Sequence, residues 1–158
     1  MRNSNMKNNN LIVTSATMAQ KMIGAKNPFM LILNKGENIG NAIIAMATKA
    51  ELKSAAFFGI GALQDLKLSF FNIATKQYQH QIFTGVYELI SFNGNLTKMQ
   101  GKYIAHMHAA ISDCNYNLYA GHLSDATVGV TAEITIIPFD LSIERKIDSE
   151  FNLNLINV

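Results

Sequence analysis

The chain has 158 residues, 49% of them hydrophobic and 15% charged, which excludes a disordered chain and fits one domain with a single core. Thirteen Lys and Arg residues oppose eleven Asp and Glu residues, so the formal net charge is only +2, and the basic residues form no polybasic stripe of the kind that binds nucleic acid. So few charges on an apolar chain favour a surface that is partly covered by another subunit.

The first residues differ in composition from the rest. Residues 1–10 are polar and include five Asn, which predicts a disordered leader before a single domain over residues 11–158. The single cysteine, Cys114, excludes an intrachain disulfide, and no apolar run approaches the roughly 18–20 residues that span a bilayer. We therefore expect a cytoplasmic protein that has no membrane partner.

Beyond the leader, the pattern is that of strands around one helix. Apolar residues recur at helical spacing within residues 38–50 and predict the main helix. The connections are too short for repeated parallel crossovers, so the predicted fold class is α+β, with a largely antiparallel β-sheet flanked by that helix. Short apolar or β-branched runs between turn-like residues predict strands over residues 29–33, 54–60, 66–73, 77–83, 86–92, 102–112, 117–122 and 128–137.

Three of the four histidines form the main candidate site. His106 and His108 are two residues apart on a predicted strand, so their side chains share one face. The next strand returns through a polar loop, and a hairpin symmetric about Asn115 pairs His108 with His122. Three neutral imidazoles that converge in this way are ligands for zinc, with a fourth position open to water or a small ligand.

Other interpretations of these histidines stay open. Two histidines in an HxH pair are most often polar residues on an exposed strand face, and a register slip of one residue would turn His122 to the opposite face. Nickel, copper and iron also bind imidazole, so the pattern does not select the metal. The fourth histidine, His80, lies in a polar stretch and is predicted to be on the surface.

A carboxylate and a glycine pair are also notable. Glu88 shares a strand face with Val86 and Ile90, where an unpaired carboxylate is costly. It is therefore a candidate catalytic general base near a metal, the alternatives being an exposed edge residue or a structural ion pair. The segment Gly59-Ile60-Gly61 lacks the third glycine of a dinucleotide-binding loop and predicts a bulge or a close approach of two strands.

Taken together, several segments resemble the PPC domain, the domain shared by plants and prokaryotes. The likeness covers about residues 34–137, with a weaker tail over residues 143–155. Each segment alone is a weak signal, but their order and spacing are fairly specific. The segments are Lys35-Gly36-Glu37, Gly59-Ile60-Gly61-Ala62-Leu63, Tyr87-Glu88-Leu89-Ile90-Ser91-Phe92-Asn93-Gly94-Asn95, His106-Met107-His108-Ala109, Ala120-Gly121-His122-Leu123 and Thr131-Ala132-Glu133-Ile134.

The resemblance implies an antiparallel sheet flanked by helix, assembled as a homotrimer. It implies a metal site, usually zinc, at His106, His108 and His122, and it carries the family glutamate onto Glu88. The family label of "putative DNA-binding" comes from plant members with an AT-hook. This chain lacks the Arg-Gly-Arg-Pro core that such a hook inserts into the minor groove, so DNA binding is not expected.

Two positions depart from the family pattern. Ala120 stands where the family has glycine, a mild change that should leave the metal site intact. The hairpin loop over residues 113–117 lacks the usual glycine, so Asn115 or Asn117 is expected to adopt the left-handed conformation instead.

The predicted function is that of a zinc-type metal-binding homotrimer. It would bind or transform a small anionic or carbonyl ligand at the three histidines, with Glu88 moving a proton. Whether it is an enzyme is left open. The alternatives are a non-enzymatic scaffold or regulatory domain and, third, direct binding to DNA.

Overall fold

The computed structural model describes residues 12–14 and 27–157, so the predicted leader over residues 1–10 lies outside the described part. The fold is mostly antiparallel sheet with one helix in this part, which confirms the predicted class. The elements in chain order are β1 (Ile12–Thr14), β2 (Phe29–Asn34), α1 (Ile39–Lys49), β3 (Ser54–Asn72), β4 (Gln77–Met99), β5 (Lys102–Ser112), β6 (Leu118–Phe139), β7 (Arg145–Ile147) and β8 (Asn154–Ile156).

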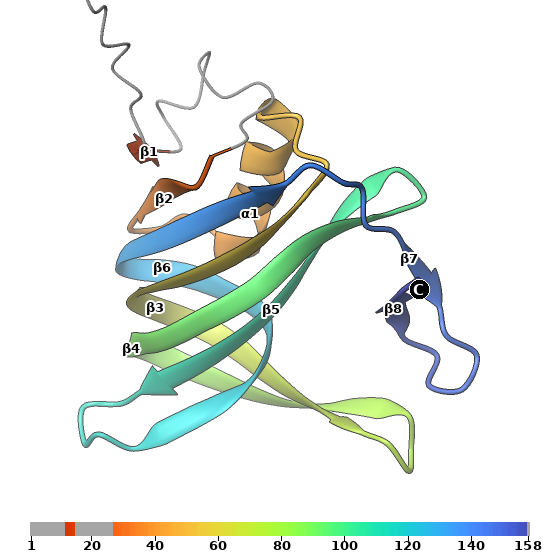
Figure 1. The fold of residues 1–158 in the computed structure, drawn as a ribbon. Coiled ribbons are helices and arrows are strands. Elements are labelled where there is room, and N and C mark those ends of the chain that lie inside the picture. The colour runs from red at the N-terminus through yellow and green to blue at the C-terminus, as the bar shows by residue number, and fades with distance from the viewer. Residues whose placement is uncertain (1–11, 15–26, 158) are drawn as a thin grey trace, which may run out of the picture.

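The main sheet curves back onto itself. Its strand order is β1-β2-β6-β3-β4-β5, and the start of β6 also pairs with β5, so four strands enclose a partly closed barrel. Among the strand pairs of the described residues, only β1 and β2 run parallel. Figure 1 shows the helix at one end of this curved sheet and the β7–β8 hairpin standing apart on the side of the C-terminus.

The helix begins where predicted because Asn38 caps it. The Asn38 side-chain oxygen accepts a hydrogen bond from the Asn41 amide at 3.0 Å. Ile39, Ile43 and Met46 are buried at the spacing that the sequence predicted, and they face the sheet core. The helix contacts β5 and β6, and Gly40 of the helix lies against Met107 of β5.

Several predicted strands are joined into longer ones. The predicted strands 54–60 and 66–73 form a single strand, β3, and 77–83 and 86–92 likewise form part of β4. The residues between them shift the register and do not reverse the chain. One shift lies between Gly59 and Gly61, as predicted, and the φ of Gly61 is 152°. A Cβ at Gly61 would collide with the Thr131 carbonyl oxygen on β6, so the two strands approach closely there.

The outer side of the barrel carries an exposed patch of large apolar side chains, which we call the apolar face. They come from the adjacent strands β3, β4 and β6, and between 48% and 62% of each is exposed. The residues are Phe58, Ile60, Val86, Ile90 and Val130. A contiguous patch of this kind is typical of a surface that another molecule covers. In the described part of the chain, no helix has the length and apolar character needed to cross a membrane.

Candidate metal centre

The β5–β6 hairpin brings the three histidines together in the predicted register. His108 lies directly opposite His122, and the pairing continues to Ser112 opposite Leu118. His106 is two residues along β5, so all three side chains project from the same face. This face is opposite to that of Met107 and Ala109, which are buried in the core.

The loop that sets this register is closed by Asp113. One oxygen of its carboxylate accepts hydrogen bonds from the backbone amides of Asn115 and Asn117, each at 2.9 Å, and the other accepts from the Asn117 side-chain amide at 3.0 Å. The bond from the Asn117 side chain, followed by those from the backbone amides, lowers the pKa of Asp113. The prediction that Asn115 or Asn117 adopts the left-handed conformation is wrong, because Tyr116 takes it, with φ of 65°. The side-chain bonds to Asp113 already hold both asparagines, so the turn falls between them.

The three imidazole rings form a compact triangle. Their ring centroids are 5.1 Å apart for His106 and His108, 5.2 Å for His106 and His122, and 5.4 Å for His108 and His122. One nitrogen from each ring lies within 4.8 Å of the other two. A tetrahedral zinc ion at 2.0–2.1 Å from each nitrogen requires separations of about 3.3 Å, so the three rings would move closer together on binding it.

Two further observations fit a metal ligand set. His122 Nδ1 is buried and has no hydrogen-bond partner, which is costly unless something outside the chain binds it. Burial, and then the neighbouring charges of His122, Arg145 and His108, lower the pKa of His106 to about 4. Burial and His108 lower the pKa of His122 as well. At neutral pH both rings are therefore in the uncharged form that a metal ion requires.

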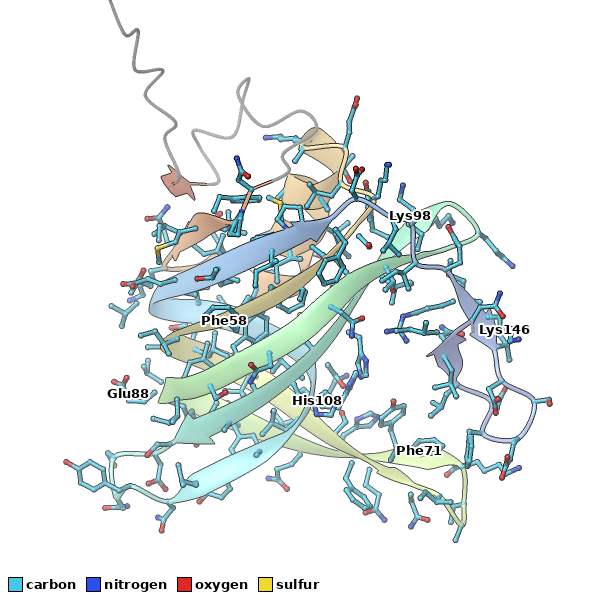
Figure 2. All side chains as sticks on the ribbon, in the orientation of Figure 1. Phe58, Phe71, Glu88, Lys98, His108 and Lys146 are labelled. Atoms are coloured by element: carbon cyan, nitrogen blue, oxygen red, sulfur yellow. The ribbon has the colours of Figure 1, made fainter. Side chains whose placement is uncertain are left out.

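Aromatic and hydroxyl side chains from the tip of the β3–β4 hairpin line one side of the triad. The Tyr78 ring lies 5.4 Å from that of His122 and 6.2 Å from that of His80. His80 is exposed, as predicted, and its Nδ1 is 2.8 Å from Ser69 Oγ, which is in turn 2.6 Å from Ser124 Oγ. Figure 2 shows His108 in the concave space between this hairpin, which carries Phe71, and the C-terminal hairpin.

A buried arginine lies on the other side of the triad. Arg145, on β7, is 9% exposed and donates to Thr97 Oγ1 at 2.7 Å, to Asn95 Oδ1 at 2.8 Å and to the Asn154 carbonyl at 2.6 Å. Asn95 is directly opposite His106 in the β4–β5 pairing. The sequence analysis did not identify Arg145 as a candidate site residue, since no local pattern reports a contact between β7 and β4.

Glu88 lies away from the three histidines. It is exposed on the apolar side of the barrel, beside Ile60 and Ile90, and it pairs with Ala62 and Ser112. Ser112 is four residues from His108 along β5, which is about 13 Å of strand. Figure 2 shows Glu88 at the left edge and His108 toward the opposite, concave side.

Comparisons with known proteins agree with this architecture. A sequence model of the Plants and Prokaryotes Conserved (PCC) domain matches residues 20–140, whereas no curated protein matches the chain. A plant- and prokaryote-conserved (PPC) protein from Pyrococcus horikoshii is 28% identical, with a TM-score of 0.78 over 84% of this chain and 92% of its own.

Two further solved structures have the same fold. A "putative DNA binding protein" from Bacteroides thetaiotaomicron is 28% identical, with a TM-score of 0.80 over 87% of this chain and 94% of its own. The metal-containing protein AF0104 from Archaeoglobus fulgidus is 22% identical, with a TM-score of 0.77 over 84% of this chain and 94% of its own. At that identity the likeness concerns the fold alone.

Proposed function

Because the chain belongs to the Plants and Prokaryotes Conserved (PCC) domain family, also written PPC, we propose that it is a metal-binding member of that family. The observation that carries this proposal is the triangle of three imidazoles, one of which has a buried nitrogen without a partner. His106, His108 and His122 would hold a divalent ion, with zinc the first candidate because its tetrahedral geometry suits three nitrogens and one open position.

The bound ion would act as a Lewis acid toward a small ligand in the open position. The triad would hold the ion on the outer face of β5 and β6, and the neighbouring Tyr78 ring would limit access from one side. Glu88 stays a proposed proton-transfer residue. Its pairing partner Ser112 is about 13 Å of strand from His108, so Glu88 is beyond hydrogen-bond reach of a ligand at its own triad. This role therefore requires that a second subunit bring its own histidines to Glu88.

A homotrimer is part of the same proposal. The apolar face is where a second copy would pack, because it is contiguous, lies on rigid strands and contains no Lys or Arg. It also surrounds Glu88, so subunit contacts would bury that carboxylate and bring it toward a neighbouring chain. We expect the assembly to work in the cytoplasm.

The metal site is tested by elemental analysis of untagged protein. The parent should carry about one equivalent of zinc or another divalent metal per chain, and His108→Ala and His122→Ala should lose most of it. His80→Ala is the matched control, since it removes an exposed histidine outside the triad. A parent that binds no metal after zinc is added would refute the proposal, as would triad variants that bind as much as the parent.

The assembly is tested by light scattering coupled to size-exclusion chromatography. Ile60→Asp should convert the trimer to a monomer, because it places a charge in the middle of the apolar face. Ile147→Asp is the control, since Ile147 is 60% exposed, close to the 57% of Ile60, but lies on the C-terminal hairpin. A parent that runs as a monomer contradicts the trimer.

A second candidate function is DNA binding, since a relative 28% identical to this chain is named "putative DNA binding protein". We propose instead that this chain does not bind duplex DNA near physiological salt, because its net charge of +2 and scattered basic residues would neutralise few phosphates. A gel shift at low and at physiological salt tests this proposal. Tight binding that weakens steeply with salt would contradict it and favour the DNA-binding alternative.

A further inference from the structure

Arg145 is a buried cation whose hydrogen-bond partners are all neutral. Only 9% of its surface is exposed, and its three acceptors are a hydroxyl of Thr97, an amide oxygen of Asn95 and the carbonyl of Asn154. A guanidinium has five N–H donors, so one N–H remains on each terminal nitrogen. A buried charge that meets only neutral oxygens is costly unless an opposite charge approaches it.

The strands fix this charge beside the histidine triad. Asn95, which accepts from Nη2, lies directly opposite His106, and Thr97, which accepts from Nε, is two residues further along β4 on the same face. The guanidinium is therefore held by the strand that neighbours β5, on the side of the sheet that carries the imidazoles. Its position does not depend on a flexible loop, because β7 supplies the residue and β4 supplies two of its acceptors.

The groups that act on this site carry positive charge or none. After burial, the groups that lower the pKa of His106 are His122, Arg145 and His108, none of which is a carboxylate. A divalent ion on three neutral imidazoles beside one guanidinium would bring the local charge to about +3. In a partly desolvated site, that charge favours an anion from solution over a neutral ligand.

We propose that Arg145 selects an anionic ligand for the proposed metal site, and that this ligand is a small oxyanion with carboxylate or phosphate chemistry. One oxygen of the ligand would take the open coordination position, and another would accept from the free N–H groups of Arg145. This inference rests on the metal site proposed above and deepens it, because it names the class of ligand and the residue that chooses it. Binding makes and breaks no covalent bond.

The test uses the protein loaded with cobalt(II), whose visible absorption reports changes at the metal. Acetate and inorganic phosphate are titrated separately, with acetamide as the neutral counterpart of acetate. We expect acetate, phosphate or both to shift the absorption bands, and acetamide to have no effect at the same concentrations. A response to only one anion identifies which chemistry the site prefers. Equal responses to acetate and acetamide would overturn the proposal.

Two variants identify Arg145 as the source of the preference. Arg145→Gln should weaken anion binding about tenfold or more while cobalt stays bound, because a charge-assisted hydrogen bond is lost. Asn95→Asp is the second variant, and it carries the test if Arg145→Gln does not fold. It keeps the shape of the side chain but places a carboxylate 2.8 Å from Nη2, so the internal anion should displace the external one. Lys146→Gln removes the exposed neighbouring charge and is the matched control.

Failure of this inference is distinguishable from failure of the metal site. Cobalt content is measured for each protein by elemental analysis. If all variants bind cobalt and their affinities for acetate and phosphate equal that of the parent, the role of Arg145 is refuted and the metal site stands. If Lys146→Gln weakens binding as much as Arg145→Gln, the effect is general electrostatics and the proposal is wrong. If the parent binds no cobalt, both proposals are refuted together.

Discussion

Without bound metal, the stability of this protein should fall as the pH falls from 7 to 4.5. His106 has a folded pKa of about 4, below its ordinary value of 6.5, because burial and three neighbouring positive groups disfavour the charged ring. Between these two values the unfolded chain binds more protons than the folded one, so the free energy of unfolding rises with pH. His122 acts in the same direction, since its pKa is lowered too.

The expected size of the effect follows from the His106 shift. The full difference of about 2.5 pH units corresponds to about 3 kcal/mol at 1.36 kcal/mol per unit, and solvent screening of this half-buried ring reduces it to about 2 kcal/mol. Between pH 7 and pH 4.5, where most but not all of the proton difference is expressed, His106 alone contributes about 1 kcal/mol. Asp113 does not obscure this window, because its pKa is lowered from 3.8 and its titration lies at more acidic pH.

The measurement is urea unfolding in the presence of a chelator, at one protein concentration, because metal and subunit association both change apparent stability. The parent should lose at least about 1 kcal/mol between pH 7 and pH 4.5. The loss of unfolding free energy in His106→Asn should be smaller by about that amount. The remaining loss would come from His122 and other titratable groups. The same pH dependence in the parent and in His106→Asn would show that the ring is not held neutral by its surroundings.

Two further substitutions test the packing and the turn. Gly94→Ala should destabilise the protein by about 3 kcal/mol in urea unfolding, because a Cβ there would collide with the Phe57 ring and with the backbone of β5. Gly40→Ala should be neutral or stabilising by up to about 1 kcal/mol, because its Cβ would come closest to the flexible end of Met107, at 3.2 Å, and would otherwise make ordinary contacts. Equal effects of the two substitutions would contradict the close approach at Gly94. Tyr116→Asn should raise the midpoint of thermal unfolding slightly, by the equivalent of less than about 1 kcal/mol, because Asn tolerates a φ of 65° better than Tyr does. A loss of stability would instead mean that the exposed Tyr116 ring makes a stabilising contact.

The sequence predicted those parts of the fold that depend on neighbours in the chain. The helix over residues 38–50 and the pairing of His108 with His122 were both accessible, since one rests on a periodic pattern and the other on a five-residue loop. The joining of predicted strands into β3 and β4 was not accessible from the sequence. Asp65 and Gly85 have the local signature of turns, and only the partner strands decide that the chain continues through them as bulges.

The residues that surround the triad could not be predicted from the sequence either, because their contacts join distant parts of the chain. Arg145 reaches Asn95 across fifty residues of sequence, and Tyr78 reaches His122 across forty-four, so neither contact leaves a pattern in any window of residues. The exposure of Glu88 likewise depends on the side of the sheet to which its strand face belongs. The alternation of apolar and polar residues along the strand does not determine that side.

The histidines of the triad come from one hairpin, whereas the arginine beside them comes from the far end of the chain. Residues 106–122 form a single β5–β6 ribbon closed by a short loop, so bringing its three imidazoles together costs little chain entropy. A metal ion that meets this ribbon before the barrel closes would find its whole ligand set already in place and would favour the native register over a slipped one. Arg145 arrives only when β7 docks against β4. The order of events during folding would then be binding of the proposed ion first and completion of the proposed ligand pocket last.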